Sequence, residues 1–163
     1  MQLKINFFSQ LKMLTDFIVM SVICSIAILG IVEACEPNVV PFFLIPYSLL
    51  FFFPPIILHL NYFEKNKNII FEIRKNEIVK IKNKEILEVR NNDIKEIVFF
   101  TSFTRNTGTS RLTYSSYYYA KIELLDGNYF VITSLVSSKI DEMLKENMND
   151  VKIKTEKVFY PMI

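Results

Sequence analysis

The stretch YYYAKIELLDGNYFVITSLV, residues 117–136, consists of two runs of alternating side chains around an Asp-Gly pair. In the first run, positions 118, 120, 122 and 124 are apolar, whereas Tyr117, Tyr119, Lys121 and Glu123 occupy the other face. Asp-Gly is a strong signal for a two-residue hairpin turn, because such turns need residues that tolerate positive φ. The stretch therefore predicts an antiparallel hairpin with strands over 114–125 and 129–134.

The same two-residue period continues upstream of this hairpin. Alternating side chains run over 69–74, 79–82 and 87–89, and a further strand is predicted over 94–100. The breaks between these runs are rich in asparagine, which favours turns. Six antiparallel strands are therefore expected over about residues 68–134.

The residues after the last of these strands change to a helical period. Ser138 is a suitable N-cap, and Ile140, Met143, Leu144 and Met148 form one apolar stripe. This pattern predicts a helix over about 138–148, and renewed alternation predicts a last strand within 151–159. The expected class is α+β, with one amphipathic helix against an antiparallel sheet or barrel.

The first third of the chain has a different composition. Residues 1–60 carry a net charge of −1 and few charged side chains, whereas residues 61–163 carry +3. Two apolar runs, at 17–32 and 39–60, are joined by a short acidic link. A helix over 39–60 would be about 33 Å long, enough to cross a hydrocarbon core of about 30 Å. The expected organisation is a transmembrane helical hairpin over 1–60 and a β domain over 61–163.

Two adjacent prolines, Pro54 and Pro55, interrupt the second apolar run. They remove two backbone donors, so the helix is expected to kink near Phe51. Ser21 and Ser25 on the first run are candidates to satisfy the freed carbonyl groups. The kink is interpreted as part of an anchor, and the alternative is a broken helix that lines a transport site.

The positions of the basic residues predict the orientation of the hairpin. Lysines precede the first apolar run and follow the second, whereas the link contains Glu33 and Glu36. The positive-inside rule then places both termini in the cytoplasm, in a multi-pass membrane protein. Two alternatives remain open: a signal peptide over residues 1–34, and a soluble protein with a very apolar helical hairpin.

Three segments together resemble a known family. They are LHLNYFEKNKNIIFEI at 58–73, NNDIKEIVFF at 91–100, and the hairpin at 117–136. Their order is similar to that of pleckstrin-homology-like (PH-like) domains, in particular the small bacterial PH-domain proteins with an N-terminal two-span anchor. The resemblance implies a non-catalytic module at the inner face of a bacterial cytoplasmic membrane, which binds a protein or lipid partner.

The residues that usually perform catalysis are sparse. The chain has one histidine, three glycines and no cysteine after residue 60, so neither a nucleophile–base pair nor a phosphate loop is visible. The sequence therefore predicts no enzyme, no metal site and no cofactor. A net charge of +3 over the β domain also argues against a nucleic-acid partner.

One polar segment, residues 101–113, is longer than a hairpin needs. Arg105 and Arg111 within it are candidates to bind a phosphate, an anionic lipid head group or an acidic protein surface. Tyr117 and Tyr119, which are expected on an exposed face, are candidates for a partner interface. The alternatives are a mobile polar loop and ordinary strand-forming tyrosines.

Two further functions remain open at this stage. A small integral membrane protein with few recognisable sites could be an immunity protein that neutralises a membrane-active toxin. A transporter or channel subunit would need a homo-oligomer formed through the hairpin.

Overall fold

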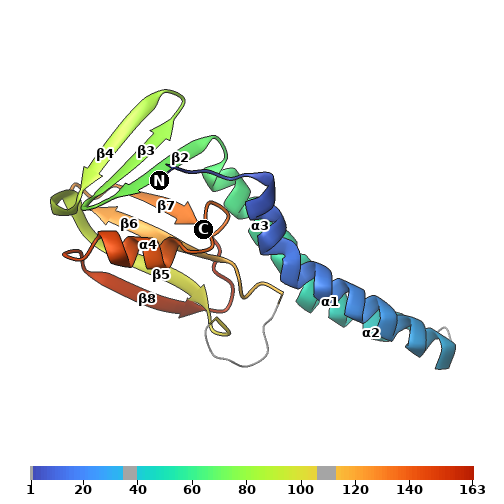
Figure 1. The fold of residues 1–163 in the computed structure, drawn as a ribbon. Helices are drawn as coiled ribbons and strands as arrows, with labels where there is room; N and C mark the ends of the chain where they lie inside the picture. The colour runs from blue at the N-terminus through green and yellow to red at the C-terminus, as the bar shows by residue number, and fades with distance from the viewer. Residues whose placement is uncertain (1, 35–39, 106–112) are drawn as a thin grey trace.

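A computed structural model of the chain describes residues 2–34, 40–105 and 113–163. It has two parts, a β domain and a stem of two long helical arms that projects from it (Figure 1). The N-terminal residues lie on the β domain, so the chain enters the stem from the domain and returns to it.

The first arm of the stem is one helix, α1 (Phe7–Ala34). It begins at an Asn6 cap, where the Ser9 N–H donates to Asn6 Oδ1 at 2.7 Å. Within the described residues, Phe7–Gly30 is the one segment that meets the length and composition of a membrane-crossing helix. Both criteria are also met by some signal sequences and by buried helices of soluble proteins.

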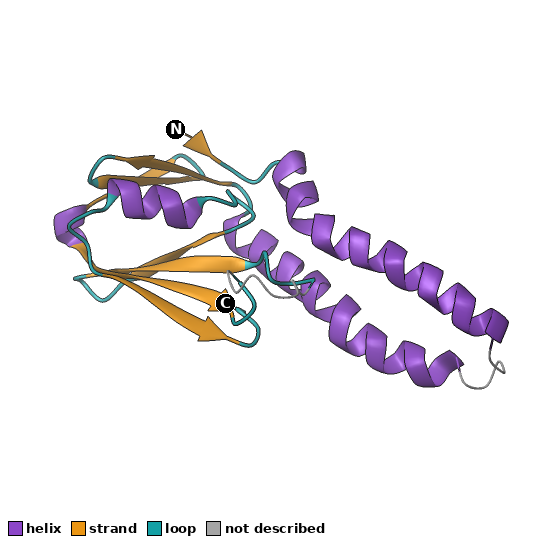
Figure 2. Ribbon diagram, turned by 60° about the horizontal axis from the view of Figure 1, so that its bottom comes forward, coloured by secondary structure: helices purple, strands orange, loops and turns teal. Residues whose placement is uncertain are grey.

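The second arm runs antiparallel beside α1 and consists of three segments (Figure 2). They are α2 (Val40–Tyr47), the π-helical η1 (Ser48–Phe52) and α3 (Phe53–Asn66). The helix therefore changes type over Ser48–Phe52, beside the position near Phe51 where the sequence predicts a kink. The prolines occupy the first turn of α3 directly after η1, so they remove N–H donors that a continuous α-helix would offer to the carbonyls of η1.

The β domain contains two four-stranded sheets. In order, the first consists of β1 (Gln2–Leu3), β2 (Ile69–Arg74), β3 (Glu77–Lys82) and β4 (Glu85–Arg90). The second consists of β7 (Tyr129–Thr133), β6 (Tyr118–Leu124), β5 (Ile94–Ser102) and β8 (Ile153–Val158). The α+β class with antiparallel sheets is confirmed.

One strand departs from the antiparallel expectation. The last strand, β8, pairs with β5 in parallel, with Ile97 opposite Ile153. After the β6–β7 pair and before β8, the chain forms α4 (Ile140–Asn147). A helical crossover of this kind brings the next strand back in the same direction as the strand before the helix. The terminal strand was expected, but the alternation within it does not determine its direction.

The turns follow residues that accept positive φ. Asn76 (φ 61°), Asn83 (φ 51°) and Lys84 (φ 72°) lie between the strands of the first sheet, and Gly127 (φ 88°) follows Asp126 between β6 and β7. Two consecutive positive values at Asn83 and Lys84 are those of a type I′ turn, which matches the twist of the flanking strands.

The helix α4 packs its apolar stripe on the main core. Ile140, Leu144 and Met148 are fully buried there, together with residues from both sheets. The helix begins one to two residues later than predicted, because Lys139 and not Ser138 is its cap. The Ser138 carbonyl instead accepts a hydrogen bond from the hydroxyl of Tyr118 at 3.0 Å.

A second apolar cluster lies between the stem and the β domain. Its members come from α1, α3, β6 and the segments beside β6 and β7: Met13, Leu58, Tyr62, Tyr114, Tyr117, Tyr119 and Leu135. The prediction that Tyr117 and Tyr119 lie on an exposed face is wrong, since they are 0% and 8% exposed. Helices α1 and α3 cover the face of β6 that was expected to contact water.

Candidate functional site: the apolar stem and its junction

The part of the stem beyond the β domain exposes large apolar side chains. On α1 they are Ile18, Val19, Val22, Ile23, Ile26 and Leu29, which are 44–65% exposed. On the second arm Phe42 is 81% exposed, and Ile45 and Leu49 are exposed as well. The sequence has no charged residue between Phe17 and Val32. Monomeric soluble proteins rarely expose a continuous apolar surface of this extent.

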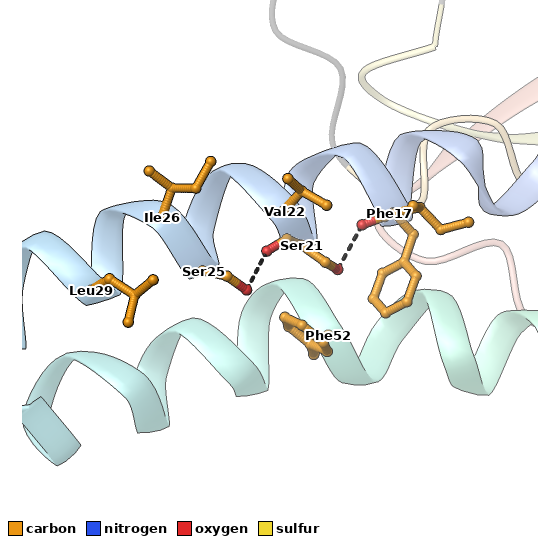
Figure 3. A pocket seen from close by; sticks show the side chains of 8 residues that line it. Phe17, Ser21, Val22, Ser25, Ile26, Leu29 and Phe52 are labelled. Atoms are coloured by element: carbon orange, nitrogen blue, oxygen red, sulfur yellow. Dashed lines mark hydrogen bonds between the residues drawn. The ribbon is translucent and has the colours of Figure 1, made fainter.

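The two arms meet along a groove with a volume of about 420 Å³ (Figure 3). Its floor includes Phe17 and Phe52, whose rings pack edge to face at 5.1 Å between centroids. Ser21 and Ser25 lie on the side of α1 that faces the second arm. Their hydroxyls donate to the Phe17 and Ser21 carbonyls of α1 itself, at 2.7 and 2.8 Å. The expectation that they satisfy the second arm is therefore not met.

A residue of the β domain satisfies one carbonyl that the prolines free. Pro55 has no N–H to donate to the Phe51 carbonyl, and Thr113 Oγ1 donates to that oxygen at 2.9 Å. Sequence reasoning missed Thr113, because it is one of several hydroxyl residues in a polar segment and carries no distinguishing signal. The bond fixes the segment before β6 to the second arm at the point where the helix changes type.

A polar seam lies between the stem and the domain at the same level. Ser116 Oγ donates to Asp16 Oδ2 of α1 at 2.7 Å. The two ring nitrogens of His59 lie 3.1 Å from the Tyr117 hydroxyl and 3.3 Å from Gln10 Oε1. Burial lowers the pKa of His59 and raises the pKa of Tyr117. The seam lies where the stem meets the β domain.

The helix α3 continues beyond the seam and is fixed to the domain. Asn66 is 1% exposed; its side-chain N–H donates to the Val131 carbonyl at 2.9 Å, and its Oδ1 accepts from the Thr133 N–H at 2.7 Å. The Tyr62 hydroxyl donates to the Pro161 carbonyl at 2.7 Å. Asn61 forms a matching amide pair with the backbone of Ile163, at 3.2 and 3.1 Å. The domain end of α3 is therefore held by hydrogen bonds to β7 and to the C-terminal residues.

The structure places Arg105 inside the domain. Its Nη2 donates to Asp141 Oδ2 at 2.8 Å, and its guanidinium carbon lies 3.2 Å from the centroid of the Tyr118 ring. The Tyr118 hydroxyl also donates to Asp141, at 2.8 Å. Arg105 is thus paired with an internal acid, contrary to the expectation that it faces an external acidic surface. Arg111 lies outside the described residues.

The candidate residues predicted from sequence therefore do not form one site. Arg105 pairs with α4, whereas Tyr117 and Tyr119 pack beneath the stem. Within the described ranges no group of three or more His, Cys, Asp or Glu side chains is arranged to hold a metal ion. The N-terminal third forms the stem, and it contacts the β domain at the junction described above.

Comparison with known proteins agrees with this architecture. A search of curated proteins found no match. A family model described as PH domain matches residues 3–141, which include both arms of the stem, the strands β2 to β7 and the start of α4. PH domains are typically non-enzymatic interaction modules. Because the match covers most of the chain, this protein belongs to the PH domain family.

Proposed function

We propose that this protein is a membrane-tethered, non-catalytic interaction module whose apolar stem inserts into a lipid bilayer. The observation that supports the proposal is the exposed apolar surface of the stem. From Phe17 to Ala34, α1 has 18 residues beyond the polar seam, or about 27 Å of helix. This length is close to the hydrocarbon thickness of about 30 Å.

The contacts of the second arm limit how much of it enters the bilayer. Pro55 and Leu58 are buried against the domain, and His59 belongs to the polar seam. The proposed inserted part is therefore residues 40–53, shorter than the 39–60 expected from hydropathy. This arm depends on α1 for insertion, because it is too short to cross a bilayer alone.

The charges on either side of the stem favour one orientation. Lys4 and Lys12 lie at the domain end of α1, and Lys65 and Lys67 lie at the domain end of the second arm. Glu33 and Glu36 lie at the opposite end in the sequence. By the positive-inside rule, the domain is on the cytoplasmic side, where it binds a protein or lipid partner. The resemblance to bacterial proteins with a two-span anchor favours a bacterial cytoplasmic membrane.

Extraction of isolated membranes with alkaline carbonate tests the insertion. The full-length protein should stay in the membrane pellet. A triple variant, Val22→Lys, Ile26→Lys and Leu29→Lys, should lose stable insertion, because each lysine at a helix centre costs about 2.5–3.5 kcal/mol. A matched control, Val22→Leu, Ile26→Leu and Leu29→Ile, should stay in the pellet. Release of the unmodified protein by carbonate would contradict the proposal.

A further inference from the structure

The helix α3 has two opposite faces, one buried and one exposed. Its buried residues are Pro55, Leu58, Tyr62 and Asn66. Its large apolar residues that are 37–61% exposed are Phe53, Ile56, Ile57, Leu60 and Phe63. Because about 3.6 residues complete one turn, the two sets lie on opposite sides of the helix. The exposed set therefore faces away from the β domain, and the described part of the chain leaves it open.

The exposed face of α3 continues along the whole second arm. On α2 and η1, Phe42, Ile45 and Leu49 are 60–81% exposed. We call the whole surface the outer stripe, and its residues are Phe42, Ile45, Leu49, Phe53, Ile56, Ile57, Leu60 and Phe63. Apart from Ile57, its members follow one another at intervals of three or four residues, and three heptads separate the first from the last. Apolar residues that recur about every 3.5 residues are typical of a helix that pairs with another helix.

A bilayer that surrounds the stem as proposed does not reach the whole outer stripe. The proposed inserted part of the second arm ends at Phe53. Leu60 and Phe63 follow it on α3 by about 10 and 15 Å of helix. The polar layer of a bilayer is about 5–8 Å thick on each side of the hydrocarbon core. The domain end of the stripe therefore extends beyond the lipid, where water does not favour an exposed apolar surface.

A second copy of this chain supplies a matching surface. Two copies inserted in the same orientation hold their second arms in parallel, and a two-fold axis along the membrane normal places one outer stripe against the other. The β domains do not obstruct this contact, because they bind the opposite face of α3. The sequence has no Asp, Glu, Lys or Arg between Phe42 and Phe63, so the pairing brings no like charges together.

We propose that the outer stripe is the interface of a parallel, two-fold symmetric dimer of this chain. The proposal rests on the proposed insertion of the stem, because insertion gives both copies the same orientation. The hydrophobic effect favours pairing over residues 56–63, and packing between helices continues it over residues 42–53 within the bilayer. Confinement to one membrane raises the effective concentration of the two copies. The dimer would present two β domains side by side to a shared partner.

Disulfide cross-linking in isolated membranes tests the interface. The background Cys24→Ser, Cys35→Ser removes the native thiols. Leu60→Cys then places one thiol on the outer stripe, and Lys65→Cys places one at an exposed position of the same helix outside the stripe. Paired stripes bring the two Leu60 positions close to the Cα separation of about 4.4–6.8 Å that a disulfide spans. With copper phenanthroline as oxidant, Leu60→Cys should give at least about five times as much linked dimer as Lys65→Cys.

Two further variants in the Leu60→Cys background separate pairing from folding. Phe63→Glu places a carboxylate in each of two facing positions, so the yield of linked dimer should fall at least about fivefold, because like charges that face each other across an interface repel. Phe63→Leu keeps an apolar side chain at this position and should retain the yield. A fall of the same size in both variants would overturn the inference.

The other occupants of the outer stripe are distinguished by the same variants. Equal linkage of Leu60→Cys and Lys65→Cys, or linkage of Leu60→Cys to another protein, would overturn the pairing of two copies. N-ethylmaleimide labels thiols that contact water, so its labelling of Leu60→Cys in proteoliposomes should rise as the protein is diluted with lipid. Protection at every dilution would show that lipid covers the stripe.

Carbonate extraction of the same membranes reports on insertion separately. Protein that stays in the membrane pellet and gives no linked dimer would overturn the dimer alone. Release of the protein by carbonate would overturn both proposals.

Discussion

The buried amide of Asn66 should be one of the largest single contributions to the attachment of the stem. In Asn66→Ala, the Val131 carbonyl and the Thr133 N–H would both lose their partner at a position that is 1% exposed. Each buried polar group left without a hydrogen bond costs about 1–3 kcal/mol, so the loss should be about 2–6 kcal/mol. For a domain of this size that corresponds to a fall in melting temperature of roughly 5–20 °C.

Asn61→Ala is the matched control, because Asn61 forms the same type of amide pair with Ile163 but remains partly exposed. Water can replace the hydrogen bonds of Asn61, so the melting temperature of Asn61→Ala should fall by no more than about 4 °C. Circular dichroism of both full-length variants in detergent, recorded during heating, measures the difference in melting temperature. If Asn66→Ala melts no lower than Asn61→Ala, burial does not determine the strength of these bonds and the reasoning is refuted.

Three other predictions concern the domain, the seam and the orientation of the stem. Asp141→Asn should weaken the contact with Arg105 and increase tryptic cleavage after Arg105 by at least several-fold, and unchanged cleavage would show that the ion pair does not hold this segment. Because burial lowers the pKa of His59, the unfolded chain binds more protons below pH 6.5, so the melting temperature should fall between pH 7 and pH 5; His59→Gln should show a smaller fall over this range. In a Cys24→Ser background, an impermeant thiol reagent added outside intact cells should label Cys35, and a protected Cys35 would contradict the proposed cytoplasmic placement of the domain.

The strands of the β domain were accessible to sequence reasoning because each is encoded locally. Alternation at 69–74 and the Asp-Gly pair at 126–127 contain the strand and turn information within a few residues. The direction of β8 was not accessible, because a strand's own pattern is the same in parallel and antiparallel pairs. Its direction follows from the crossover through α4, which is a property of the whole domain.

The burial of Tyr117 and Tyr119 was inaccessible for a similar reason. A run in which tyrosine and lysine alternate with apolar residues is typical of a strand with one solvent-exposed face. The sequence does not show that helices cover that face. Arg105 illustrates the same limit. An arginine in a polar segment resembles a free ligand-binding group until the fold brings Asp141 beside it from 36 positions away.

The continuous attachment of α3 has a mechanical consequence. Asn66 and Tyr62 bind the helix to the domain, and Thr113 and Ser116 bind both arms at its edge, so the described residues join stem and domain at several points. A helix in a bilayer tilts when the hydrocarbon thickness differs from its apolar length. If the stem inserts as proposed, such a tilt would also turn the β domain that is bound to it. The thickness of the surrounding membrane would then determine which surface of the domain faces the cytoplasm and which faces the lipid.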